Sequence, residues 1–222
     1  MFAILGCFLS LFLMAHPVYA STFKTPVIVI DPGHGGIDGG TQNADGTVLE
    51  KDLNLIIAKK LADQLKKHGL TVELTREKDE DVTKYAPHDR GWGRHKRDLF
   101  GRVEFARQKQ ATIMISLHGN HGTNKSRGAV VFYQLSSPES YLLASELQTR
   151  LNRLTQSFHS PEKGKEFYII RKPEIPSVLV EYGYLSNPNE FANLMDEKYQ
   201  QKMVETLKEG ILHFMIFYHL PR

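Results

Sequence analysis

Short apolar runs alternate with longer amphipathic stretches along most of this chain. Four consecutive β-branched residues, Val27–Ile30, form the first run, and this pattern predicts a buried strand. The same reasoning predicts four more strands, together with an edge strand at Phe167–Ile170. The four are Thr71–Leu74, Ile113–Leu117, Ala129–Tyr133 and Ser177–Val180.

Between these runs, apolar residues recur at helical spacing. The spacing predicts helices at Lys51–His68, Asp98–Gln110, Pro138–Thr155 and about Glu197–Phe217. Gly69 is the natural stop of the first helix. Five apolar residues are expected on one face of that helix: Leu53, Ile56, Ile57, Leu61 and Leu65.

Strands that alternate with helices indicate an α/β fold. We predict a single domain in which a mainly parallel, twisted sheet carries helices on both faces. The polar segment Glu77–Arg97 is expected to be an exposed excursion. In "SNPNE", Asn187 is expected to cap a further helix, with Glu190 as its capping-box partner.

The composition is that of an ordinary globular protein, with 41% hydrophobic and 24% charged residues in 222. This length is most simply one domain, large enough to bury a core. The net charge of +3 is far too weak to indicate nucleic-acid binding, so no nucleic-acid partner is expected.

The first twenty residues differ from the rest because they carry no charged side chain. The apolar run Phe2–Met14 has signal-peptide length, and small residues suited to cleavage end at Ala20. We expect residues 1–20 to be a signal peptide, or else a retained membrane anchor, and residues 21–222 to be the functional domain, exported across the membrane. Because Cys7 is the single cysteine, any metal in that domain must be held by His, Asp or Glu.

Four ionisable residues are expected at one edge of the predicted sheet. His34 lies four residues past the first strand, His118 and Glu181 directly follow two others, and Glu50 opens the next helix. Ligands bind at the carboxyl ends of the strands in such sheets. Two imidazoles and two carboxylates provide what a catalytic zinc site needs: three protein ligands and a fourth group as base.

Each of these residues also has an ordinary structural explanation. A histidine among glycines is often a turn residue, Glu50 or Asp52 could complement a helix dipole, and Glu181 could form an ion pair. Their convergence on one edge favours the site. His121 is the closest rival of His118, but a ligand is better placed at the strand end, so His121 is expected in the loop or substrate groove.

Four motifs carry a resemblance to a known family. "VIVIDPGHGGIDGG", "EKDLNLIIAKKLADQLKKHG", "ISLHGN" and "PSVLVEYGYLSNPNE" occur in this order and resemble the zinc-dependent N-acetylmuramoyl-L-alanine amidases. The segments "RGAVVFYQ" and "RKPEIPSVLVEYGYLSNPNE" look most like the spore-cortex, germination-type members. The sequence departs from the family pattern at Gly119, at Tyr184 and most of all in "FHSPEKGKEF".

The resemblance implies a role for each of the four residues. His34, Glu50 and His118 would bind one zinc ion, and Glu181 would be the catalytic base. The implied reaction is hydrolysis of the amide between the lactyl group of N-acetylmuramic acid and L-alanine in peptidoglycan.

The resemblance also implies partners. The substrate would be a glycan strand with its stem peptide, and Asn120 and Arg76 are candidates to contact it. A monomer is expected, with a cell-wall or membrane-anchored protein as a candidate regulator. Two alternatives stay open: another zinc peptidase acting on the stem peptide, or a non-catalytic wall-binding module.

Overall fold

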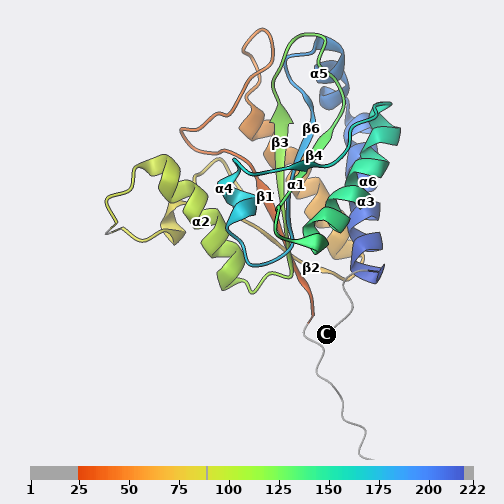
Figure 1. The fold of residues 1–222 in the computed structure, drawn as a ribbon. Coiled ribbons are helices and arrows are strands. Elements are labelled where there is room, and N and C mark those ends of the chain that lie inside the picture. Colours follow the sequence, from red (N-terminus) through yellow and green to blue (C-terminus); the bar gives the residue numbers. More distant parts are fainter. Residues whose placement is uncertain (1–24, 89, 218–222) are drawn as a thin grey trace, which may run out of the picture.

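A six-stranded sheet forms the centre of the computed structural model, which describes residues 25–88 and 90–217 (Figure 1). The strand order is β2-β1-β3-β6-β4-β5. All neighbouring strands are parallel except the pair β6 and β4, which is antiparallel. The strands are β1 Val27–Pro32, β2 Thr71–Leu74, β3 Ile113–Asn120, β4 Val130–Tyr133, β5 Glu162–Lys163 and β6 Ser177–Tyr184.

Helices cover both faces of this sheet (Figure 1). Helices α1, α3 and α6 pack on one face, and α2 and α4 pack on the other. The helices are α1 Glu50–Lys67, α2 Arg94–Gln108, α3 Pro138–Thr155, α4 Tyr168–Arg171, α5 Pro188–Met195 and α6 Glu197–Phe217, with a 3-10 turn η1 at Thr83–Tyr85.

The central strands are apolar on both faces because both faces are covered. Ile28 and Ile30 of β1 pack against α1, while Val29 between them packs against α2. This alternation follows from the period of two along a strand. The predicted α/β class, with a mainly parallel sheet and helices on both faces, is therefore confirmed.

The predicted edge strand Phe167–Ile170 is wrong. Residues Tyr168–Arg171 form the short helix α4, and the edge strand is β5, Glu162–Lys163. Ile169 and Ile170 are both buried in the cluster with Phe105. A strand would send these neighbours to opposite faces, whereas one helical turn turns both toward the core.

The apolar face predicted for α1 is wrong at one position. Ile56 is 44% exposed, although Leu53, Ile57, Leu61 and Leu65 are buried as expected. Asn54 takes the buried place instead, and its side chain bonds to Glu50 Oε1 at 3.2 Å. The hydrogen bond between Asn54 and Glu50 therefore helps to determine which side of α1 is buried at the end nearest the candidate site.

The cap of α5 is as predicted at Asn187 and different at Glu190. Asn187 Oδ1 accepts hydrogen bonds from the backbone N–H groups of Asn189 and Glu190. The Glu190 carboxylate accepts from the N–H groups of Gly128, in the loop before β4, and Tyr184, the last residue of β6. Glu190 thus ties the end of β6 to the loop before β4.

The predicted signal peptide or anchor, residues 1–20, lies outside the described residues. Within the described residues, no helix combines the length and apolar character needed to cross a membrane.

Candidate metal centre

The carboxyl ends of three neighbouring strands meet at one edge of the sheet. Pro32 of β1 pairs with Leu117 of β3, and His118 of β3 pairs in register with Glu181 of β6. Because residues paired in register point to the same face, the His118 and Glu181 side chains leave the sheet together. The expected convergence is therefore present in the topology.

His34, Glu50 and His118 form the one group among the described residues with metal-ligand spacing. One potential ligand atom from each lies within 4.8 Å of the other two. Glu50 Oε1 is 3.2 Å from His34 Nε2 and 3.0 Å from His118 Nδ1. The three side chains come from the loop after β1, the first residue of α1 and strand β3.

This spacing fits a zinc ion. Zinc binds imidazole nitrogen and carboxylate oxygen at about 2.0–2.2 Å in a tetrahedral arrangement, which puts two ligand atoms roughly 3.3 Å apart. The observed separations of 3.0 Å and 3.2 Å are close to this value. Three ligands would leave the fourth position open, as catalytic zinc sites require.

Two positions in the loop around His34, Gly33 and Gly40, are glycine because the ligand residues fill the space that a side chain there would need. A Cβ on Gly33 would lie 2.3 Å from the His118 ring, and one on Gly40 would lie 2.5 Å from Glu50 Oε2. The loop can therefore pass close to both other ligands only without side chains at these positions.

Neighbouring groups fix the carboxylate of Glu50. Its Oε2 accepts from the N–H of Thr41 at 2.8 Å, and its Oε1 accepts from the N–H of Gly119 at 3.1 Å. Burial raises the pKa of Glu50, but hydrogen bonds with His118 and His34 outweigh it and hold the pKa well below its usual range. Glu50 is thus an anion at neutral pH, as a metal ligand must be.

Asp38 supports His34 from the other side of its ring. Asp38 Oδ1 lies 3.0 Å from His34 Nδ1, while His34 Nε2 faces Glu50. Metal-binding histidines commonly direct their second nitrogen to a carboxylate, which orients the ring. Burial lowers the pKa of His34, but Glu50 and Asp38 raise it overall, so the site favours positive charge.

Glu181 has the environment of a general base. Its Oε2 is buried and has no hydrogen-bond partner among the described residues. Burial, aided by the charge of Glu50 and opposed by His118 and His34, raises the pKa of Glu181 to about 6. A carboxylate with a pKa near neutrality can both accept and return a proton.

Arg76 is buried beneath the loop that carries His34. Arg76 is only 2% exposed, and its guanidinium donates to the backbone carbonyls of Pro32, Gly33, Lys51 and Lys78. This burial argues against the expected substrate contact and makes Arg76 a support of the loop before His34.

Asn120 and His121 lie at the edge of the site. Asn120 Oδ1 accepts from the N–H of His121, and His121 Nδ1 lies 2.8 Å from Thr41 Oγ1. His121 is exposed and does not belong to the group with metal-ligand spacing, as expected for a groove residue. A substrate contact of Asn120 stays a prediction.

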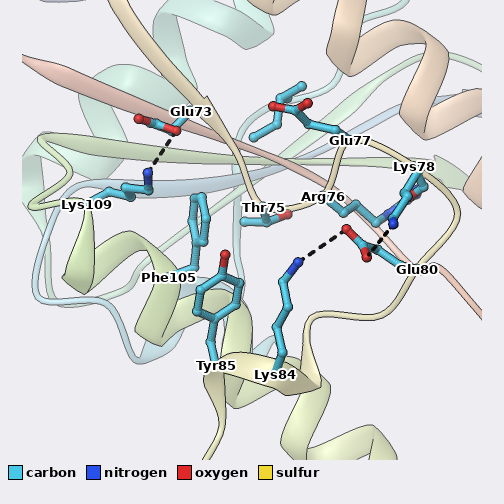
Figure 2. Close-up of a pocket in the computed structure, with 11 residues that line it drawn as sticks. Glu73, Thr75, Arg76, Glu77, Lys78, Glu80, Lys84, Tyr85, Phe105 and Lys109 are labelled. Carbon is cyan, nitrogen blue, oxygen red and sulfur yellow. Dashed lines mark hydrogen bonds and ion pairs between the residues drawn. The ribbon is translucent and has the colours of Figure 1, made fainter.

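A separate cavity of about 540 Å³ lies between β2 and α2 (Figure 2). Several of its charged side chains form ion pairs: Lys109 lies 3.2 Å from Glu73, and Lys84 lies 3.4 Å from Glu80 (Figure 2). This cavity does not contain the group of residues with metal-ligand spacing.

Sequence reasoning missed the residues that support the ligands. Asp38, four residues after His34, could have been found as a carboxylate within reach of a predicted ligand. Asn54 was detectable only as a polar residue within an apolar helix stripe. Its partner Tyr182, whose hydroxyl donates to Asn54 Oδ1, is 128 residues away and gave no local signal.

Comparison with known proteins agrees with this geometry. Residues 28–213 match the family model described as N-acetylmuramoyl-L-alanine amidase. The chain is 36% identical over 192 residues to the germination-specific N-acetylmuramoyl-L-alanine amidase of Bacillus subtilis (strain 168), covering 85% of this chain and 79% of the relative. The resemblance to germination-type members is therefore confirmed.

Solved structures give the same result. The CwlD amidase from Clostridioides difficile, in complex with the GerS lipoprotein, has a TM-score of 0.79 and 32% identity, covering 86% of this chain and 98% of that one. The catalytic domain of CwlV, an amidase from Bacillus (Paenibacillus) polymyxa var. colistinus, has a TM-score of 0.74 and 31% identity over 86% of this chain and 98% of that one. This protein therefore belongs to the N-acetylmuramoyl-L-alanine amidase family of hydrolases.

Proposed function

We propose that this amidase binds one zinc ion through His34, Glu50 and His118 and uses Glu181 as its catalytic base. The substrate is the amide between the lactyl group of N-acetylmuramic acid and L-alanine in peptidoglycan. The observation that carries this proposal is the group of three ligand atoms within 4.8 Å, together with the buried Glu181 Oε2, which has no hydrogen-bond partner in the described part of the chain.

The residues of the chain have separate roles in this reaction. When bound, zinc supplies a Lewis acid that acidifies water and polarises a carbonyl group. Glu181 Oε2 takes the proton of the attacking water and returns it to the leaving amine of L-alanine. Glu50, held by Thr41 and Gly119, and His34, held by Asp38, keep their ligand atoms in place while the bond breaks.

Metal content tests the ligand assignment. Zinc measured in purified His34→Ala and His118→Ala should fall far below one ion per chain, and His121→Ala is the control that should keep its zinc. Wild-type zinc content in both ligand variants would contradict the assignment.

A digest of purified peptidoglycan, with and without a chelator, tests the reaction. Mass spectrometry should find intact stem peptides with a free L-alanine amine, and these should disappear with the chelator. Shortened stem peptides would indicate the alternative zinc peptidase instead. A protein that binds peptidoglycan without releasing any product would indicate a wall-binding module.

We further propose export to the wall side of the membrane and regulation by a wall or membrane-anchored protein. Relatives named cell wall amidases support the location, and the CwlD amidase solved with the GerS lipoprotein supports a protein partner. N-terminal sequencing of the exported form should find a start near Ser21. A product that retains Met1 and stays in the cytoplasm would refute export.

A further inference from the structure

We propose that Arg102 is a positioning residue for the metal centre, which holds His34 in its ligand conformation through the backbone. This inference rests on the proposed zinc site. Arg102 lies on α2, 68 residues from His34, and its Nη2 donates to the His34 carbonyl oxygen at 2.7 Å.

The backbone of His34 creates the need for such a support. His34 has a φ of 61°, in the left-handed region that a residue with a side chain rarely adopts. The following Gly35 and Gly36 also have positive φ, and hydrogen bonds between Gly35 and Asp38 close a tight turn directly after His34. A strained backbone persists only where surrounding contacts determine it.

Arg102 provides that contact and is itself fixed at both ends. Its Nη1 donates to Asp31 Oδ1 at 2.7 Å and to the Pro32 carbonyl at 2.9 Å, while its Nε donates to Asp98 Oδ2 at 2.8 Å. Arg102 is 2% exposed, and Asp31 is 1% exposed. The planar guanidinium therefore joins two buried carboxylates to the backbone carbonyls of Pro32 and His34.

Arg76 and Arg102 both donate to carbonyls of this loop and share that of Pro32. Arg76 donates to the carbonyls of Pro32 and Gly33, whereas among the described residues Arg102 is the side chain that donates to the carbonyl of His34. The other two ligands need no such help, because Glu50 begins a helix and His118 lies in a central strand. Loss of Arg102 should therefore affect the metal centre through His34 alone.

Arg102→Lys tests this role with the charge retained. Lysine keeps a positive charge beside Asp31 and Asp98. It lacks the planar guanidinium group, whose several N–H donors reach these carboxylates and the His34 carbonyl at the same time. The full-length variant should bind zinc about 10- to 100-fold more weakly in a chelator competition, the usual effect of losing a support around a metal ligand. Arg102→Gln, measured in parallel, should weaken zinc binding at least as much.

Two controls separate positioning from general destabilisation. Leu207→Ala removes core packing on α6 and should lower the melting temperature of the metal-free protein while leaving zinc affinity within about twofold of wild type. In a His34→Ala background, Arg102→Lys should change zinc affinity by no more than about twofold, because the ligand it positions is gone.

The outcomes are distinct. Wild-type zinc affinity in folded Arg102→Lys would overturn this inference, as would an equal loss of affinity with and without His34. If both Arg102 variants fail to fold where Leu207→Ala folds, Arg102 is a folding residue and the inference is also overturned. If His34→Ala itself binds zinc as tightly as wild type, the proposed metal site fails instead.

Discussion

The two faces of the sheet are built in different ways. The face under α1, α3 and α6 carries the larger hydrophobic cluster, to which all three helices and the central strands contribute. The face under α2 and α4 carries a smaller hydrophobic cluster and, toward the carboxyl end of β1, buried charges: Asp31, Asp98 and Arg102. His118 and Glu181 leave the sheet on this second, charged face.

The difference shows where stability and function are separated. Burial of apolar surface is the main stabilising term and is not directional, so the first face holds the fold together. Hydrogen bonds between buried charges are directional, and the second face uses them to set the loop that carries His34. Substitutions in the hydrophobic core of the first face should therefore leave metal binding intact. Substitutions of the buried charges on the second face should weaken it.

Replacement of Glu181 by glutamine should have the largest effect on activity. General base catalysis is typically worth about 10²- to 10⁴-fold in rate, or roughly 3 to 5 kcal/mol of barrier. The variant should keep its zinc and its melting temperature, since Glu181 Oε2 has no hydrogen-bond partner to lose among the described residues. Rate, zinc content and melting temperature should be measured on one preparation.

Glu162→Gln, which changes an exposed carboxylate on β5, is the matched control and should behave as wild type. A folded, zinc-loaded Glu181→Gln with activity within about tenfold of wild type would show that the base lies elsewhere.

Asp31→Asn should give the largest loss of stability on the charged face. It removes the charge of one of the two carboxylates that pair with the buried Arg102, the one at 2.7 Å, and breaking a buried ion pair typically costs about 3 to 5 kcal/mol. Denaturant unfolding of the metal-free protein measures this loss. A change within about 0.5 kcal/mol would show that the charges of this face do not support the fold.

Asp31 should also make the free energy of unfolding depend on pH. Burial raises the pKa of Asp31, but the Arg102 charge and the hydroxyls of Thr75 and Ser116 outweigh it and lower the pKa overall. A lowered carboxyl pKa stabilises the fold above the unfolded value of about 3.9, and this contribution is lost as the pH falls through the folded value. Wild type should therefore lose part of its advantage over Asp31→Asn in acid, and a constant difference between them would contradict this.

Leu207→Ala should give a loss of stability on the apolar face without loss of metal. Leu207 is fully buried, and Leu→Ala changes in cores cost about 2 to 5 kcal/mol. Urea unfolding of the metal-free protein measures the cost, and chelator competition should find zinc affinity unchanged. A large fall in zinc affinity would break the separation between the two faces.

Asp38→Asn should give a smaller, local effect. The amide can still occupy the place beside His34 Nδ1 but carries no charge. Zinc affinity should therefore fall about tenfold, the low end of the range for losing a residue that supports a metal ligand. The melting temperature of the metal-free protein should change little, because Asp38 is partly exposed. Unchanged affinity would show that the glycine loop orients His34 without this carboxylate.

The sequence alone determined most strands and helices, in their order along the chain, and the four ionisable residues expected at one sheet edge. Alternating apolar runs and helical spacing are local patterns, so they predicted the main elements and the sheet edge at which His34, His118 and Glu181 meet. The prediction was wrong at Phe167–Ile170, where the structure has a helical turn. A short apolar run does not distinguish a strand, whose neighbouring side chains point to opposite faces, from a helical turn that directs them to one side.

Only the tertiary structure decided how the ligands are held. The supporting contacts join residues that are far apart in the chain, such as Arg102 and His34 at 68 residues and Tyr182 and Asn54 at 128. Arg76 looked like a substrate contact from its sequence position, and packing made it a buried donor to loop carbonyls. Local spacing encodes the period of an element, whereas the partner of a buried charge depends on which distant surfaces the fold brings together.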